Sequence, residues 1–394
     1  MSSVKRWQLP DGVEELLPTT ARRLESLRRR VTDLHFSFGY ELVNPPLIEY
    51  LESLLTGTGE TLDLQTFKLV DQLNGRTMGV RADMTPQVAR IDAHLLQSQD
   101  VSRLFYMGSV LRTRPDSPGG SRSPLQLGAE LYGHGGPESD IEIITLMLKT
   151  LETAGITRPL LDIGHVGVYR GLVSEAALVP EQEQRLFDAI LRKSAPEVTD
   201  LLGEFALPAA VNSRLSALLE LSGGTEVIDA ARSALAGTPE QVARALDTLQ
   251  IIVSTLQQQG LSSDVHVDLT ELRGYAYHTG VLFAAFAESS GDEVARGGRY
   301  DDIGAAFGRA RPATGYSTDL KMLARGYTVD SASPRGIFVG SQETDASAEV
   351  ARLREQGERV VTQLPGSSQS GAEAVCDREL IWRDNQWVIV DLTT

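Results

Sequence analysis

The segment that decides the fold spans residues 103–134 and reads RLFYMGSVLRTRPDSPGGSRSPLQLGAELYGH. Apolar residues dominate 104–111 and 125–132, and Pro, Gly, Ser and Arg dominate the residues between them, so we expect two strands joined by a loop. In the second strand, side chains alternate between an apolar face and a face that carries Gln126 and Glu130. The segment therefore predicts a sheet with one polar side.

That polar side suits a small ligand that carries both signs of charge. Gln126 and Glu130 would project together, and an amide oxygen beside a carboxylate favours an ammonium group. The loop supplies Arg112, Arg114 and Arg122, whose planar guanidinium groups suit carboxylate or phosphate oxygens. On this segment alone, an ordinary hairpin with a solvated face is an equal alternative.

Two features upstream of this segment also bear on the fold. Residues 20–38 have the apolar stripe of an amphipathic helix, and a short strand at 40–43 precedes Asn44-Pro45-Pro46. Because proline donates no ladder hydrogen bond, we expect this strand at a sheet edge or a subunit boundary, as in a homodimer contact.

A second hairpin is predicted at 66–70 and 76–81, about an Asn-Gly turn. It leads into Arg81-Ala82-Asp83-Met84-Thr85-Pro86, directly before a helix expected at 87–96. Asp83 and Thr85 could line a pocket or merely cap that helix, and capping is the favoured interpretation of this fragment taken alone.

In the second half of the chain the sequence pattern changes from strands to helices and then back to strands. Helical periodicity with proline breakers fills 173–259, where nothing resembles chemistry. Strands are expected again from 265, and Gly297-Gly298 either brings the backbone close to a ligand or forms a connecting turn. From residue 336 onward we expect a compact α/β unit, which contains no lysine and in which acids outnumber arginines.

Composition narrows the class of protein. The chain has 394 residues, 41% of them hydrophobic and 23% charged, which is ordinary for a globular protein. No apolar run is long enough to cross a bilayer and the N-terminus lacks a signal-peptide core, so we expect a cytoplasmic protein without membrane contact. The net charge of -16 argues against a nucleic-acid partner. A single cysteine and six scattered histidines favour neither a disulfide nor a metal site, and we expect no cofactor.

The order of the motifs is more specific than any one of them. Leu9-Pro10-Asp11-Gly12, the segment 81–86, the strand 126–130, Arg273-Gly274 with Tyr277, and the segment 296–301 together resemble the catalytic core of histidyl-tRNA synthetase over roughly the first 325 residues. The resemblance implies an α+β fold: a class II aminoacyl-tRNA synthetase-like antiparallel sheet flanked by helices, dimerising through the first helix and its edge strand. We expect a core at 1–330, with a helical insertion at about 173–259, and a small C-terminal α/β domain at 331–394.

The same resemblance implies a histidine pocket. By position, Thr85, Gln126 and Glu130 fall on residues around the ammonium group, and Asp83 falls where the family usually has glutamate. Arg273 falls near the carboxylate, while Tyr277 and His278 fall beside the imidazole, the second in place of a tyrosine. The implied histidine-binding set is Asp83, Thr85, Arg112, Gln126, Glu130, Arg273, Tyr277 and His278.

Departures from the synthetase pattern affect ATP binding. Met322 follows Lys321 where the family has an ATP-binding arginine, and Arg114 and Gly120 replace an acid and an arginine near the nucleotide. The acidic tail is also shorter than an anticodon-reading domain. These losses look like the histidyl-tRNA synthetase-like regulatory subunits of ATP phosphoribosyltransferase, a non-catalytic family of histidine biosynthesis.

That resemblance implies assembly with a short-form catalytic subunit, as a homodimer within a hetero-oligomer for which we expect a hetero-octamer. It also implies activation of the catalytic subunit, with histidine as the feedback effector. Two alternatives from other classes are a functional histidyl-tRNA synthetase and a free-standing amino-acid enzyme on the same fold. Both would need the ATP site that the departures have altered.

Overall fold

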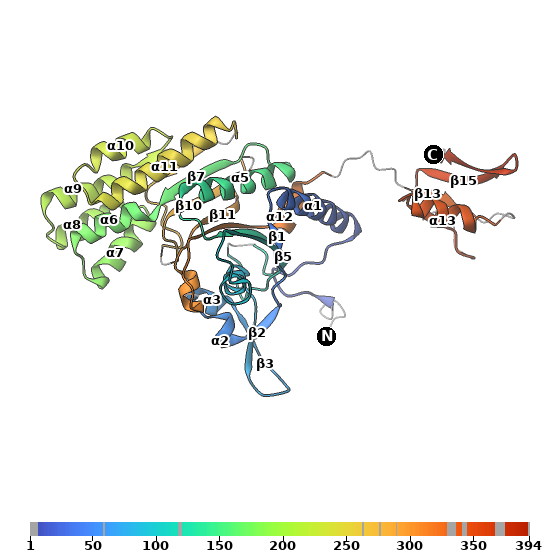
Figure 1. Cartoon of the computed structure of the whole chain (residues 1–394), viewed down its shortest axis with the longest axis horizontal. Helices are drawn as coiled ribbons and strands as arrows, with labels where there is room; N and C mark the ends of the chain where they lie inside the picture. The colour runs from blue at the N-terminus through green and yellow to red at the C-terminus, as the bar shows by residue number, and fades with distance from the viewer. Residues whose placement is uncertain are drawn as a thin grey trace. The chain divides into compact units, whose positions relative to one another are not determined.

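The computed structural model describes residues 7–57, 60–116, 120–261, 264–275, 277–288, 290–328, 336–340, 345–366 and 375–392. The chain divides into two compact units, Met1–Tyr327 and Thr328–Thr394. The N-terminal unit holds a large sheet with helices around it, and the C-terminal unit is a small α/β unit (Figure 1).

A nine-stranded sheet is the centre of the N-terminal unit. Its neighbouring strands run antiparallel except for two parallel pairs, β1 with β5 and β7 with β9. The short β1 lies at one end of the sheet, so the expectation of an edge strand beside the two prolines is confirmed. The strand order is β1 (Glu41–Leu42), β5 (Ser102–Ser109), β6 (Leu125–Tyr132), β12 (Ala313–Asp319), β11 (Glu293–Arg299), β10 (Val281–Phe286), β7 (Leu160–His165), β9 (Asp264–Asp268) and β8 (Ser222–Gly223).

Helices cover one face of this sheet (Figure 1). They are α1 (Pro18–Ser37), α5 (Pro137–Thr153), α11 (Glu240–Gln258) and α12 (Leu320–Gly326). Tyr316 of β12 points toward them, because its hydroxyl lies 2.9 Å from Nε2 of His35 on α1 and 2.8 Å from Oγ1 of Thr150 on α5. By strand alternation, its neighbours Gly315 and Ser317 face the other side of the sheet.

A group of helices between β7 and β9 forms the insertion, drawn in green and yellow in Figure 1. The expected helical insertion at about 173–259 consists mainly of helices and also contains the two-residue strand β8, which pairs with the outer edge of β9. Open strand edges accept such short additions because their backbone groups lack partners. The insertion comprises α6 (Val166–Ala176), α7 (Pro180–Leu191), α8 (Ala195–Glu204), α9 (Ala209–Ala217), the 3₁₀ turn η3 (Leu218–Glu220), α10 (Val227–Ala234) and α11.

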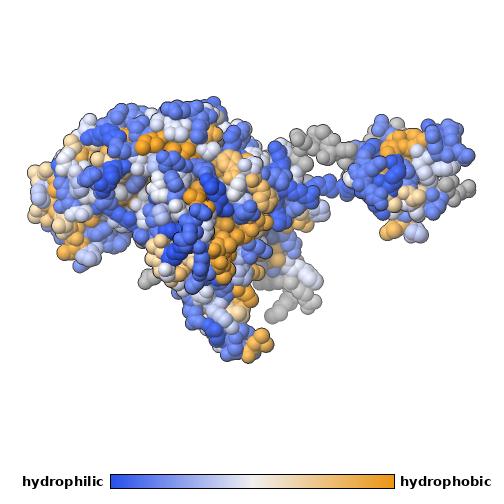
Figure 2. Space-filling model, viewed as in Figure 1, coloured by the Kyte–Doolittle hydropathy of each residue, from blue (hydrophilic) through white to orange (hydrophobic). Residues whose placement is uncertain are grey.

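A three-stranded sheet lies beside the large one and leads into the site. Its hairpin of β3 and β4 ends in an exposed apolar tip, at which Leu73 is 95% exposed (Figure 2). After β4, Arg81 donates hydrogen bonds to the carbonyls of Ser109 (2.9 Å) and Pro45 (2.6 Å), which fixes the chain just before Asp83. The elements are β2 (Ile48–Tyr50), α2 (Leu51–Leu54), α3 (Glu60–Gln65), β3 (Phe67–Val70), β4 (Thr77–Val80), α4 (Thr85–Arg90) and the π-helical turn η2 (Ile91–Leu96).

The sheet decides between alternatives that the sequence left open at two places. The polar face of β6 is not solvated, since every residue from Gln126 to Tyr132 is buried and α4 packs against this strand. Gly297 and Gly298 do not form a turn, because both lie inside β11, opposite Tyr316 and Gly315 of β12. Burial on both faces means that Glu130 lies in the protein interior rather than in water.

The C-terminal unit contains a four-stranded sheet in the order β14-β13-β15-β16, and its described residues include the helix α13. The strand β15 turns into β16 at Asp384 and Asn385, which both have positive φ, as a tight hairpin turn requires. Leu380 is fully buried with residues of β13 and α13 in a separate small core. The elements are β13 (Ile337–Val339), α13 (Ser347–Glu355), β14 (Val360–Thr362), β15 (Arg378–Arg383) and β16 (Gln386–Asp391).

Candidate functional site

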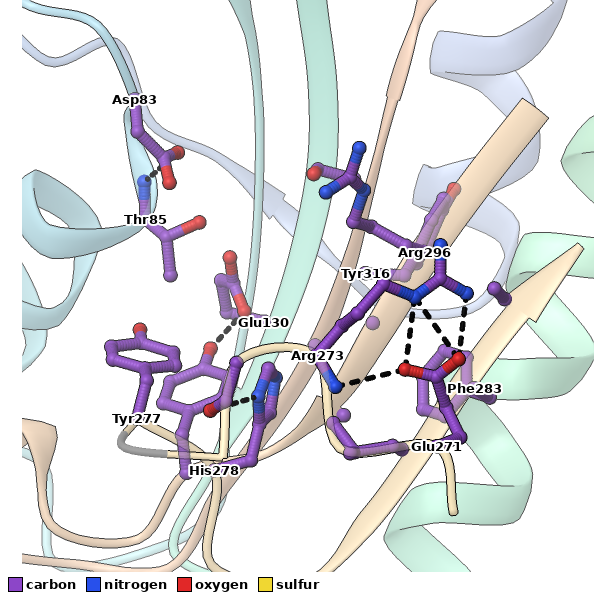
Figure 3. Close-up of a pocket in the computed structure, with 18 of the residues that line it drawn as sticks. Asp83, Thr85, Glu130, Glu271, Arg273, Tyr277, His278, Phe283, Arg296 and Tyr316 are labelled. Atoms are coloured by element: carbon purple, nitrogen blue, oxygen red, sulfur yellow. Dashed lines mark hydrogen bonds and ion pairs between the residues drawn. The ribbon is translucent and has the colours of Figure 1, made fainter. Parts of the chain in front are cut away.

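A cavity of about 240 Å³ lies on the face of the large sheet that α1 and α5 leave uncovered (Figure 3). Small-molecule sites in proteins start at roughly 300 Å³, so this volume suits a ligand the size of an amino acid better than a nucleotide. We call it the sheet pocket. Its polar lining comprises Asp83, Thr85, Glu130, Glu271, Arg273, Tyr277, His278, Glu293, Arg296, Tyr300 and Ser317.

Glu130 lies at the bottom of the sheet pocket and is 1% exposed. Tyr106 on β5 donates a hydrogen bond to its Oε1 (2.9 Å), and Tyr300, just after β11, donates one to its Oε2. Burial raises the pKa of Glu130 to about 8, although both tyrosine hydrogen bonds act in the opposite direction. Among the described residues, no lysine or arginine forms an ion pair with this carboxylate.

Two glycines make room for these side chains. A Cβ atom on Gly315 of β12 would lie 1.6 Å from Oε2 of Glu130, its partner across the strands. A Cβ atom on Gly128 of β6 would lie 2.3 Å from the hydroxyl oxygen of Tyr106. Both contacts are far inside van der Waals distance, so these positions need glycine for the side chains of Glu130 and Tyr106 to lie where they do.

The acidic wall of the pocket continues at Asp83. Its Oδ1 accepts hydrogen bonds from the backbone N–H of Thr85 (3.0 Å) and from Nε2 of Gln126 (2.7 Å), while Oε1 of Gln126 accepts from the backbone N–H of Met84 (3.0 Å). Gln126 therefore positions Asp83, and its amide oxygen is already bonded to the backbone. Asp83 lines the pocket and accepts a hydrogen bond from the first residue of α4, but the N-cap of that helix is Met84, with no side-chain cap.

Arg273 forms the opposite, cationic wall. It contacts Glu271 through Nε and Nη2, with the shortest distance 2.7 Å, and Glu293 through Nη1 at 3.0 Å. The hydrogen bonds to Glu271 are the main cause of a raised pKa for Arg273. The side chain is therefore held in one place and is half exposed, facing the pocket (Figure 3).

Tyr277 and His278 close a third side of the pocket. Within the described part of the chain, the buried hydroxyl of Tyr277 has no hydrogen-bond partner. The ring Nδ1 of His278 lies 3.1 Å from the carbonyl of Gly274, and burial lowers the pKa of His278 to about 4. The imidazole is thus neutral at pH 7 and donates from Nδ1, which leaves Nε2 as an acceptor.

A second cavity, of about 420 Å³, adjoins the sheet pocket and shares Asp83, Glu293, Arg296 and Ser317 with it. We call it the acidic groove, because four carboxylates and two guanidinium groups line it. Met322 also lines it. The charged lining residues are Asp83, Arg112, Asp116, Glu293, Arg296 and Asp319.

Six of the eight predicted histidine-binding residues line the sheet pocket, and two do not. Asp83, Thr85, Glu130, Arg273, Tyr277 and His278 come together there, whereas Arg112 and Gln126 line the acidic groove. Sequence reasoning did not include Tyr106, Tyr300, Glu271 and Glu293. The signal for Tyr106 was its place beside Gly128, since an aromatic ring often fills the space above a glycine on the neighbouring strand.

Other classes of site find no support in the described residues. No group of three or more His, Cys, Asp or Glu side chains in that part of the chain is placed to bind a metal ion. No helix among the residues described is both long enough and apolar enough to span a bilayer.

The amino-acid sequence matches two known family models and two full-length relatives. The family model of histidyl-tRNA synthetase matches residues 12–323, and that of the ATP phosphoribosyltransferase subunit HisZ C-terminal domain matches residues 334–390. The chain is 56% identical to an ATP phosphoribosyltransferase regulatory subunit from Thioalkalivibrio sulfidiphilus and 53% identical to one from Pseudomonas syringae pv. tomato, in both cases over the full length of both chains.

Solved structures show the same relationship. The chain is similar to an ATP phosphoribosyltransferase regulatory subunit/histidyl-tRNA synthetase from Bacillus halodurans, with a TM-score of 0.82 and 29% identity over 94% of this chain and 96% of that one. A histidyl-tRNA synthetase from Nostoc shares the fold at a TM-score of 0.78 and 18% identity, over 98% and 97% of the two chains. The expected class II synthetase-like fold and the non-catalytic assignment are both confirmed. The chain belongs to the family of ATP phosphoribosyltransferase regulatory subunits.

Proposed function

We propose that this regulatory subunit binds free histidine in the sheet pocket and transmits its presence to a catalytic ATP phosphoribosyltransferase subunit, as activator and feedback regulator of the first step of histidine biosynthesis. The observation that carries the proposal is Glu130, a buried carboxylate without a cationic partner among the described residues. Burial without a cation disfavours the ionised form of this group, and a ligand ammonium group would supply the missing counter-charge and stabilise that form.

The remaining walls match the other groups of histidine. Arg273 pairs with Glu271 and Glu293 through three of its five N–H groups, and the two that remain, one on each terminal nitrogen, could bind a ligand carboxylate. Asp83 adds a second acid near the ammonium position. The free hydroxyl of Tyr277 and the Nε2 acceptor of His278 suit the two ring nitrogens of a neutral imidazole. Every group of the ligand would therefore meet a complementary group of the protein.

Calorimetric titration with histidine tests the assignment. Glu130→Gln keeps the shape of the side chain and removes its charge, and we expect it to weaken histidine binding about 10- to 150-fold, since hydrogen bonds to charged groups contribute roughly 1.5–3 kcal/mol. Glu152→Gln, at the exposed end of α5, removes the same charge outside the pocket and should bind normally. Unchanged affinity in Glu130→Gln would mean that histidine does not bind here.

Two histidine analogues distinguish the contribution of Glu130 to ligand binding from that of Arg273. Imidazole lactate lacks the ammonium group, and histamine lacks the carboxylate. We expect wild-type protein to bind imidazole lactate far more weakly than histidine. Glu130→Gln should lose this preference, whereas Arg273→Met should lose the preference for histidine over histamine.

We also propose a homodimer through the β1 edge, within a hetero-oligomer that contains the short-form catalytic subunit and for which a hetero-octamer is the expected form. Apolar side chains support this surface, because Leu42, Leu47 and Ile48 are each more than 40% exposed. Figure 2 also shows a hydrophobic patch near the centre of the viewed face of the N-terminal unit. Light scattering of Leu42→Asp should detect monomers, whereas Leu73→Asp at the β3–β4 tip should remain dimeric.

The domain boundary near residue 330 is likewise a proposal, supported by the separate core about Leu380 and by the division of the chain after Tyr327. All residues that line the sheet pocket belong to the N-terminal unit. A fragment that ends at residue 327 should therefore bind histidine like the full chain. Loss of binding by a folded fragment would contradict the proposed independence.

A further inference from the structure

We propose that Asp116 acts as an internal counter-anion in the acidic groove, where it occupies the arginines that a phosphate group would need and so excludes polyphosphate ligands. The inference concerns the acidic groove alone and does not depend on the identity of the ligand in the sheet pocket. Two arginines remain in the groove, so the cations lost elsewhere do not by themselves exclude phosphate. The carboxylate of Asp116 would do so.

The side chain of Asp116 is held on both of its oxygens. Oδ2 forms an ion pair with Nη1 of Arg112, and Oδ1 accepts a hydrogen bond from Nε2 of Gln65 (3.1 Å) at the end of α3. Oδ2 also lies 4.0 Å from Nη2 of Arg296. The carboxylate thus lies between the two guanidinium groups of the groove, where an incoming anion would otherwise bind.

One further donor of each arginine is also engaged. Nε of Arg112 donates to the carbonyl of Ala82 (3.2 Å), and Nε of Arg296 lies 2.5 Å from Oε1 of Glu293. Asp83 and Asp319 add two further carboxylates to the lining. With four acids against two arginines, the groove repels an anion that does not first displace one of its own carboxylates.

Displacement of Asp116 by a phosphate is unfavourable for two reasons. The carboxylate is attached to the same chain as its arginine partner, so the ion pair forms without the loss of translational freedom that a free anion must accept. A phosphate would also leave Asp116 as an unpaired negative charge beside it. Neutralising Asp116 should remove both obstacles while leaving Arg112 and Arg296 in place.

Inorganic triphosphate is the probe for this prediction, because it carries the phosphate charges without a base or a sugar. Calorimetry on the full-length protein should show that Asp116→Asn binds triphosphate at least about tenfold more tightly than wild type, since one charge-assisted hydrogen bond to Arg112 becomes available. Asparagine can still accept the hydrogen bond from Gln65. Asp116→Ser provides a second neutral variant if the first folds poorly.

Two controls make the result specific. Glu152→Gln changes the net charge by the same amount outside the groove and should bind triphosphate like wild type. Arg112→Met combined with Asp116→Asn should lose the gain, because the released guanidinium is gone. The gain should also shrink as salt is added, as expected for a partly exposed charge interaction.

Three outcomes would overturn the proposal. They are equal triphosphate affinity in wild type and both neutral variants, a gain that persists in the double variant, and a gain of the same size in Glu152→Gln. Histidine titrations on the same samples report separately on the sheet pocket. Normal histidine binding with no gain in triphosphate affinity would reject the role of Asp116 alone, whereas loss of histidine binding by Glu130→Gln bears only on the pocket.

Discussion

The hydroxyl of Tyr300 donates a hydrogen bond to the carboxylate of Glu130, and both side chains are almost completely buried. Tyr106 donates to the other carboxylate oxygen. Two neutral donors stabilise a negative charge less than a cation would, and burial still raises the pKa of Glu130 to about 8. The empty pocket therefore holds a mostly protonated acid at pH 7, and an ammonium ligand would require its deprotonation.

Histidine affinity should consequently rise with pH between about 6.5 and 8. Below pH 8 the ammonium must displace a proton from Glu130, so the dissociation constant should fall several-fold per pH unit, approaching tenfold, and level off near pH 8. Calorimetry at pH 7 in buffers of different ionisation enthalpy should detect the release of close to one proton per histidine bound.

Glu130→Gln tests whether Glu130 is the source of the proton that is released when histidine binds. Its weaker histidine binding should show little dependence on pH over the same range, because this variant lacks the carboxyl group whose pKa burial raises. Proton release of equal size in this variant would assign the effect to another group, such as the ligand itself.

The same pKa predicts a stability difference in the absence of ligand. Since the folded-state pKa of Glu130 lies above its unfolded value, the folded protein keeps a proton that the unfolded chain releases between about pH 4.5 and 8. The contribution of this group is full below pH 4.5 and is lost as pH rises through 8. Glu130→Gln cannot lose a proton, so its excess stability over wild type should grow from pH 5 to pH 8 by a few kcal/mol at most. Urea denaturation at both pH values measures the change, and a constant difference would contradict the raised pKa.

Gly315→Ala should damage the pocket and the fold together. The new methyl group would overlap Oε2 of Glu130, so the two strands or the carboxylate must shift, at a cost of about 1–3 kcal/mol in the free energy of unfolding. Histidine binding should be lost or greatly weakened. Gly326→Ala at the end of α12 has open space at its Cβ position and should be close to neutral in both measurements.

Several parts of this architecture could be predicted from the chain itself. Periodicity placed α1 and the hairpin of β5 and β6, because alternation and the helical stripe are local patterns. The edge position of β1 followed from Pro45 and Pro46, which cannot join a ladder on both sides. The resemblance to the synthetase core then brought distant segments into one pocket.

The environment of each charge could not be predicted in the same way. Asp116 and Arg112 are four residues apart, yet their pairing depends on a loop conformation that no periodic pattern encodes. Glu271 and Glu293 flank Arg273 because the segment after β9 reaches β11, although β10 and β7 lie between these two strands in the sheet. Burial of the Glu130 face required α4 to pack against β6, which is a tertiary contact.

The free hydroxyl of Tyr277 provides the last prediction. Because this buried group has no partner among the described residues, Tyr277→Phe should leave the free energy of unfolding unchanged or raise it by up to about 1 kcal/mol. Histidine affinity should nevertheless fall about five- to tenfold, since a neutral hydrogen bond to the ligand is lost.

Tyr316→Phe is the matched control, since its hydroxyl bonds His35 and Thr150 on the opposite side of the sheet. This variant should lose about 1–3 kcal/mol of stability and keep its histidine affinity, because it removes the hydrogen-bond partner of Nε2 of His35 on the face of the sheet opposite the pocket. Thermal melting and calorimetry on the two variants should therefore give opposite patterns. If Tyr277→Phe binds histidine as tightly as wild type, the phenol does not contact the ligand, and the imidazole must lie against another wall of the pocket.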